Sequence, residues 1–67
     1  MSTFRFQLNA IPAEVVDHLE KSIESVPHVQ SVRVDAGAAT VVIEHDGADV
    51  DEIRATLREE GFQARVE

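Results

Sequence analysis

The side chains best suited to chemistry are the three histidines, His18, His28 and His45, because the chain has no cysteine. Imidazole is then the only borderline metal ligand left. Ten residues separate the first two histidines, which corresponds to about 15 Å if the segment is helical. We therefore predict surface histidines with no assigned role, no bound metal and no cofactor. The alternative is a site in which a histidine joins Asp17 or Asp46 around a harder ion.

The carboxylates form no catalytic pattern. Thirteen residues are acidic, but Asp49, Asp51 and Glu52 suit the start of a helix, and Glu59 and Glu60 suit its solvated face. The sequence shows no Ser/His/Asp order, no glycine-rich phosphate loop and no carboxylate pair on opposed elements. We predict that the chain is not an enzyme.

Size and charge exclude further classes. Sixty-seven residues make one small domain, spanning residues 1–67, which must be stabilised by its aliphatic and phenylalanine side chains alone. The net charge of −7 disfavours binding to nucleic acid or an anionic membrane. No apolar run is long enough to cross a bilayer, and no secretory leader pattern is present. We expect a cytoplasmic protein.

The apolar pattern changes period along the first half of the chain. Residues 3–8 alternate apolar and polar, which predicts a strand. Residues 12–25 place apolar side chains at helical spacing after Pro12, and Pro27 ends that helix. Val32 and Val34, then Val41 and Ile43, alternate on either side of a turn at 35–37, which predicts a hairpin.

The second half repeats the order. Asp49 with Glu52 three residues later predicts a capping box at the start of a helix, and Gly61 predicts its C-cap. Residues 62–66 alternate again and predict a closing strand. The fold class is therefore α+β, a ferredoxin-like βαββαβ domain whose four-stranded antiparallel sheet carries both helices on one face.

Four segments also resemble the heavy-metal-associated domain, the family of small copper chaperones and of the N-terminal domains of metal-transporting ATPases. They are residues 16–23 (VDHLEKSI), 26–29 (VPHV, where the family usually has Pro-Gly-Val), 32–35 (VRVD) and 60–64 (EGFQA). The resemblance extends over nearly the whole chain without a gap and implies the same fold. It also implies a metallochaperone-like function, with partner proteins.

The functional motif of that family, Gly-Met-x-Cys-x-x-Cys, is absent here. Counting back from Pro27, the Gly and Met positions are Asn9 and Ala10, and the two cysteine positions are Pro12 and Val15. Transfer of soft metal ions needs both thiolates at the start of the helix, whose positive end stabilises their charge. The resemblance thus implies a degenerate metal site.

Two surfaces remain as candidate binding sites. If the apolar strand residues face the helices, then Arg5, Arg33 and Arg65 share the open face of the sheet with Glu44. This face is either an ordinary solvated surface with an Arg–Glu pair or a surface that binds a protein partner. It lacks the aromatic side chains that stack on RNA bases.

The second surface is the loop at 9–13, which presents Ile11 and Pro12. These residues either form a small apolar docking patch or close over the end of the core. The leading hypothesis is therefore a non-enzymatic module that binds a protein partner, as a monomer or weak homodimer. The alternatives are metal binding or transport through His and carboxylate donors, and a small-molecule regulatory domain of the ACT type, which would be a homodimer.

Overall fold

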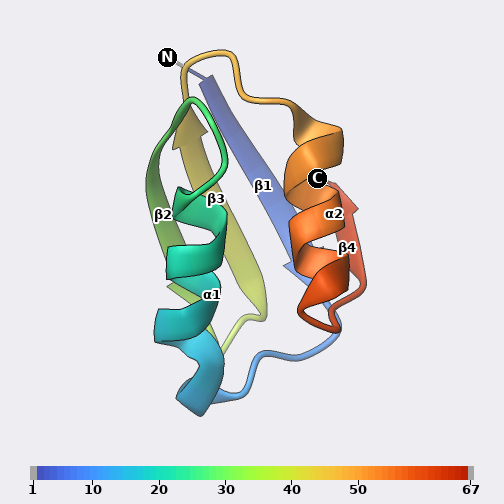
Figure 1. The fold of residues 1–67 in the computed structure, drawn as a ribbon. Coiled ribbons are helices and arrows are strands. Elements are labelled where there is room, and N and C mark those ends of the chain that lie inside the picture. Colours follow the sequence, from blue (N-terminus) through green and yellow to red (C-terminus); the bar gives the residue numbers. More distant parts are fainter. Residues whose placement is uncertain (1, 67) are drawn as a thin grey trace.

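Four strands form one antiparallel sheet in the order β2-β3-β1-β4, and both helices cover the same face of it (Figure 1). The computed structural model describes residues 2–66. Its elements are β1 (Ser2–Leu8), the short 3₁₀ helix η1 (Ala13–Val15), α1 (Val16–Glu24), β2 (Val29–Asp35), β3 (Thr40–His45), α2 (Val50–Glu59) and β4 (Ala64–Val66). The predicted βαββαβ fold is confirmed.

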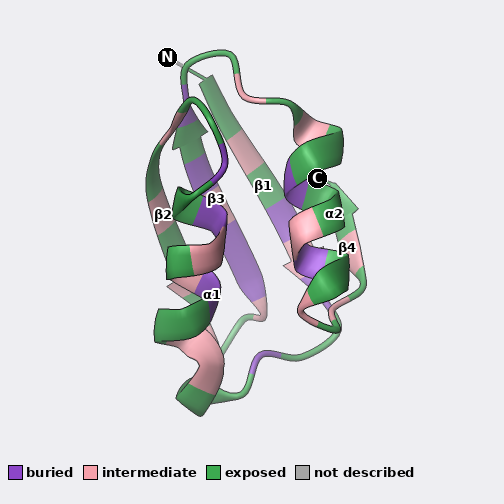
Figure 2. Ribbon diagram, viewed as in Figure 1, coloured by how far each residue is buried: buried purple, intermediate pink, exposed green. Residues whose placement is uncertain are grey.

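The hydrophobic core lies between the sheet and the two helices (Figure 2). The alternation of β1 and β3 turns Phe6, Val41 and Ile43 toward the helices, where they are fully buried. The helices contribute aliphatic residues from one stripe each, and the loop before η1 adds one more. With Val26 from the turn after α1, the core members outside the strands are Ile11, Leu19, Ile23, Val26, Ile53 and Leu57.

The second helix begins and ends largely as its sequence predicts. The Asp49 carboxylate accepts a hydrogen bond from the backbone N–H of Asp51 at 2.9 Å. Gly61 adopts a φ of 91°, and the bonds Gly61 N–H to Arg58 O and Phe62 N–H to Leu57 O, both 3.0 Å, form a Schellman C-cap. The prediction of a reciprocal capping box was wrong, because within residues 2–66 the Glu52 side chain makes no bond back to Asp49.

The first helix and the last strand are shorter than predicted. The α-helix begins at Val16 rather than Pro12, because the preceding turn is wound as 3₁₀, with Val15 N–H donating to Pro12 O at 3.1 Å. The closing strand begins at Ala64 rather than Phe62. Residues 62–63 instead complete the turn that leaves α2.

Two turns use a left-handed residue that is not glycine. His28 has a φ of 71°, follows Pro27, and lies inside a turn closed by Val29 N–H donating to Val26 O at 3.3 Å. This arrangement is typical of a type II turn, which favours Gly at the third position. In the hairpin predicted to turn at 35–37, the positive φ of 53° falls on Ala39 rather than on Gly37.

Candidate functional site

The loop that leads from β1 to η1 occupies the position of the missing metal motif. Ile11 is only 6% exposed and belongs to the core, whereas Pro12 is exposed at the start of η1. Val15 is half-buried and packs against the core cluster. Of the two alternatives for this loop, closure over the end of the core therefore applies to Ile11. Pro12 remains at the surface, where a docking patch would lie.

This loop has no chemistry for a soft metal ion. The side chains of Pro12 and Val15 contain only carbon and hydrogen, so neither cysteine position offers a donor atom. Among residues 2–66 no group of three or more His, Asp or Glu side chains is placed to hold a metal ion. The residues present therefore do not fit a thiolate metal site.

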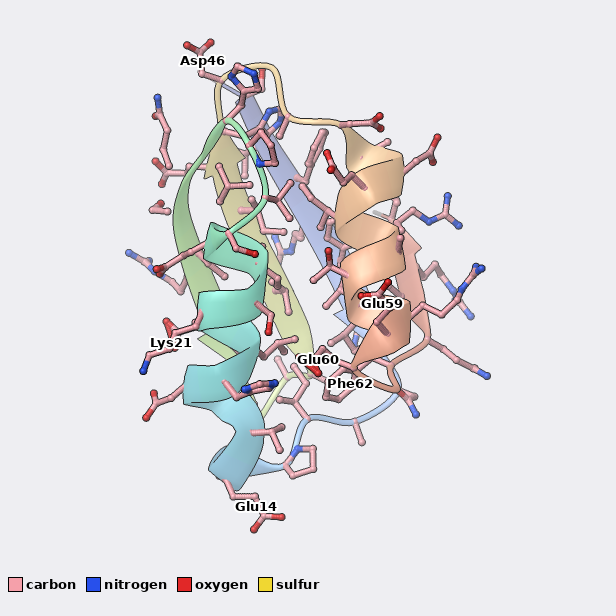
Figure 3. The ribbon with its side chains drawn as sticks, in the orientation of Figure 1. Glu14, Lys21, Asp46, Glu59, Glu60 and Phe62 are labelled. Atoms are coloured by element: carbon pink, nitrogen blue, oxygen red, sulfur yellow. The ribbon has the colours of Figure 1, made fainter. Side chains whose placement is uncertain are left out.

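A polar contact near this loop joins the two helices. His18 on α1 places its Nε2 2.7 Å from Oε1 of Glu60, and Ser22 donates its hydroxyl to the same oxygen at 2.8 Å. Figure 3 shows Glu60 at the end of α2, between the two helices. The prediction of surface histidines is right about the exposure of His18 but missed its carboxylate partner. The imidazole and the carboxylate together offer two atoms that could bind a metal ion. Because the His18 side chain is 70% exposed, the contact is a bridge between the two helices at the protein surface.

The prediction of surface histidines is wrong for His45, which is buried. It is 5% exposed, and its ring stacks on Phe4 with a centroid distance of 3.8 Å. Its Nδ1 accepts the backbone N–H of Ala48 at 3.0 Å, and its Nε2 has no hydrogen-bond partner among the described residues. The alternation of Val41 and Ile43 continues to His45, so the sequence did contain the signal for its burial.

The open face of the sheet carries the predicted arginines. Arg5 and Arg33 both pair with Val42 of β3, one from each side, so the three form a single row across the sheet. Arg65 lies opposite Gln7, and Gln7 and Arg5 share this face of β1. All three arginines and Glu44 are exposed. Within residues 2–66 Arg33 makes no ion pair with Glu44, so the predicted pairing does not hold for this arginine.

This face also carries shorter exposed polar side chains beside the arginines. Glu44 lies opposite Thr3 and Ser31, in the row next to the arginines. Among residues 2–66 the hydroxyls of Thr3 and Ser31 make no hydrogen bond with Glu44. Of the helices within residues 2–66, none has the length and apolar character needed to cross a membrane.

The comparisons with known proteins agree with the geometry. The model of the heavy-metal-associated domain matches residues 13–63. A comparison with curated protein sequences found no match.

Three similar solved structures match nearly the full length of the chain. The first domain of the human copper chaperone for SOD1, in its copper(I)-loaded form, is 29% identical with a TM-score of 0.81, over 97% of this chain and 90% of that one. The N-terminal domain of PacS from Synechocystis PCC6803 is 25% identical with a TM-score of 0.86, over 100% and 98%. A third structure, described as concerning crosstalk between Cu(I) and Zn(II) homeostasis, is 25% identical with a TM-score of 0.88, over 100% of both chains.

Proposed function

This chain belongs to the heavy-metal-associated domain family, and because both cysteine positions of the family motif hold hydrocarbon side chains, we propose that it is a non-enzymatic protein-binding module that does not transfer metal through thiolates. The single observation behind the proposal is the pair Pro12 and Val15. The scaffold of the family is retained, while the donor atoms are absent.

The surfaces proposed for binding are the open sheet face, with Arg5, Arg33, Arg65 and Glu44, and the exposed Pro12 of the first loop. Arginine is enriched at protein interfaces because its planar guanidinium forms several hydrogen bonds at once. A sheet with one face free of helices offers a broad surface for such contacts. Membership of the heavy-metal-associated family favours this function over an ACT-type regulatory domain. The cytoplasmic location and the monomeric or weakly dimeric state stay predictions.

The remaining alternative is metal binding by histidine and carboxylate. The observation in its favour is the 2.7 Å contact between His18 and Glu60. A structural zinc site takes four ligands, and even a catalytic site takes three from the protein. Two donors on an exposed surface fall short of that number.

The experiment that tests the proposal compares the native chain with the double variant Pro12→Cys/Val15→Cys. Each protein is titrated with Cu(I), Zn(II) and Ni(II) while backbone amide and histidine ring signals are followed by NMR. We expect the native chain to show no shifts at equimolar metal. The double variant is expected to bind one Cu(I), because the i and i+3 positions restore the family spacing on an intact scaffold.

The single variants Pro12→Cys and Val15→Cys are the matched controls and should bind Cu(I) far more weakly than the double variant. Saturable binding of any of the three ions by the native chain would overturn the proposal. Shifts centred on His18 and Glu60 would instead assign the histidine and carboxylate site.

A further inference from the structure

The outer edge of β4 is an unpaired edge of the sheet. β4 pairs only with β1, through Phe6 with Val66, Gln7 with Arg65 and Leu8 with Ala64, and it is the last strand in the sheet order. On its other side the structure has no strand within residues 2–66. Backbone N–H and C=O groups on such an edge are available to a further strand.

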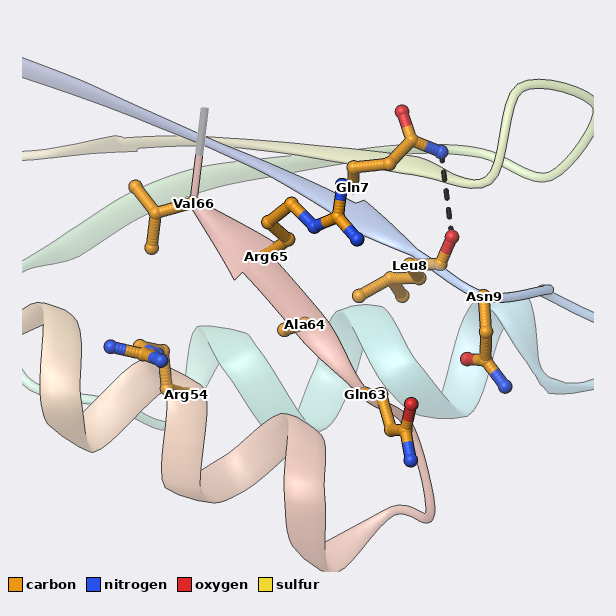
Figure 4. A pocket seen from close by; sticks show the side chains of 8 residues that line it. All are labelled: Gln7, Leu8, Asn9, Arg54, Gln63, Ala64, Arg65 and Val66. Carbon is orange, nitrogen blue, oxygen red and sulfur yellow. Dashed lines mark hydrogen bonds between the residues drawn. The ribbon is translucent and has the colours of Figure 1, made fainter.

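A hollow follows this edge (Figure 4). It has a volume of about 590 Å³ and runs from the end of β1 past β4 to Arg54 of α2. A second hollow of about 390 Å³ continues toward Arg58 and shares Arg54, Gln63 and Ala64 with the first. The edge is thus flanked by space rather than by packed side chains.

The cations along this edge have no partner in the described part of the chain. Arg54 and Arg58 lie four residues apart on α2, so they project from the same side of that helix. Arg65 extends from β4 toward the opposite face of the sheet (Figure 4). Within residues 2–66 none of the three makes an ion pair or a side-chain hydrogen bond. The sequence has six basic and thirteen acidic residues, so three unpaired arginines along one edge are a local reversal of the overall charge.

From this geometry we propose that the β4 edge binds an acidic segment of a partner protein in extended conformation, which adds to the sheet as a fifth strand. The inference rests on the proposed function, whose partner class it specifies. Backbone hydrogen bonds to β4 provide the register, and the arginines on both sides of the edge select the charge.

The alternation of a strand defines the pattern of the partner. Side chains of the added strand that face the helices meet Arg54, Arg58 and the exposed Val66, which is 44% accessible. Side chains on the other face meet Arg65. Acidic residues on both faces, with an apolar residue opposite Val66, satisfy all of these neighbours.

A second copy of this chain fits the edge poorly. Two β4 edges placed side by side bring two sets of three arginines together, and within residues 2–66 the strand β4 itself carries no carboxylate. Charge on a short edge strand is a common protection against such self-pairing. The same charge attracts an acidic strand, so the edge discriminates between the two occupants.

The test uses three acetylated and amidated eight-residue peptides. The first repeats the unit Glu-Glu-Val-Val, which places both glutamate and valine on each face of a strand, the second has lysine in place of glutamate, and the third has proline at two of the valine positions. Each is titrated into the isotopically labelled native protein, and amide shifts give both the site and the Kd. We expect the first peptide to shift residues 63–66 and leave β2, the opposite edge, unshifted. The lysine and proline peptides should bind at least tenfold more weakly, because charge and strand pairing are both required.

The variant Arg54→Gln/Arg58→Gln should bind the glutamate peptide at least tenfold more weakly than the native protein. The affinity of the native protein for this peptide should also fall as the salt concentration is raised. The control is Lys21→Gln, which removes one charge from the exposed side of α1 and should change the Kd less than twofold. Equal shifts on both edges, equal binding of the proline peptide, or an unchanged Kd in the double variant would each overturn the proposal. Concentration-dependent dimerisation through β4 without peptide would assign the edge to a second copy instead. Failure here leaves the metal titration unaffected, so the two proposals fail separately.

Discussion

The two ends of the sheet are closed by different kinds of contact. At one end, which we call the loop end, the chain passes from β1 through Ile11 and Pro12 to η1, and the closure is apolar, since Ile11 is buried in the core. At the other, the histidine end, Asp46 N–H donates to His28 O at 2.9 Å and His45 stacks on Phe4. The registers place them at opposite ends of β3, which begins at Thr40 and ends at His45.

The two ends differ in what they bury, because the loop end buries the aliphatic Ile11 whereas the histidine end buries an imidazole ring. At the loop end, the two positions of the family's cysteine motif are Pro12 and Val15, next to the buried Ile11. Two polar side chains are buried: Thr40 at the loop end, and His45 at the histidine end, where it accepts the backbone N–H of Ala48. Stability measurements at both ends test whether these contacts are structural.

The largest effect is expected at the loop end. Ile11→Ala should lower the free energy of unfolding by about 2–3 kcal/mol, because it removes a buried aliphatic side chain and leaves a cavity. Urea denaturation followed by circular dichroism measures the change. The control Pro12→Ala, one residue away at the exposed position, should change it by about 0.5 kcal/mol or less. Equal effects from the two variants would contradict the apolar closure.

A smaller effect is expected at the histidine end. His45→Ala should cost about 2 kcal/mol, since it removes the ring stacked on Phe4 and the acceptor of the Ala48 N–H bond. His45→Phe keeps a ring of similar shape, loses that one acceptor and eliminates the unpaired buried Nε2, so its cost should stay below about 1 kcal/mol. The same denaturation experiment compares them. If the phenylalanine variant were as unstable as the alanine variant, the hydrogen bond rather than the ring would dominate.

The smallest effect has the opposite sign. His28→Gly should stabilise the chain by about 0.5 kcal/mol, because relief of the left-handed conformation outweighs the greater flexibility of glycine in the unfolded state. The thermal midpoint should rise by a few degrees. His28→Ala keeps the strain and should give no increase. A loss of stability in the glycine variant would show that the imidazole itself supports the turn.

The fold could be predicted from local patterns, and the departures have local causes. The apolar–polar alternation predicted β1 and the hairpin, and Gly61 predicted the end of α2. Each of these elements depends on residues only a few positions apart in the chain. The same alternation indicated the burial of His45, but histidine is only intermediate among residue types in how often it is buried. The start of α1 was misplaced because proline suits the first turn of either a 3₁₀ or an α-helix.

The candidate sites were predictable only in part. The row of Arg5 and Arg33 followed from strand period, which fixes the face of each side chain. The contact of His18 with Glu60 joins residues 42 positions apart and depends on how the two helices pack. Arg54 and Arg58 were not singled out, because nothing in their helix indicates that β4 lies beside it.

By itself, the sequence determined the element order, the open sheet face and the absence of thiolate donors at the family position. These follow from residue type and from periods of two and 3.6, which act over short stretches of chain. Only the tertiary structure decided that Ile11 is buried while Pro12 is exposed, that Glu60 bridges two helices, and that three arginines line one sheet edge. Such contacts join residues far apart in the chain, and packing, which local sequence does not encode, brings them together.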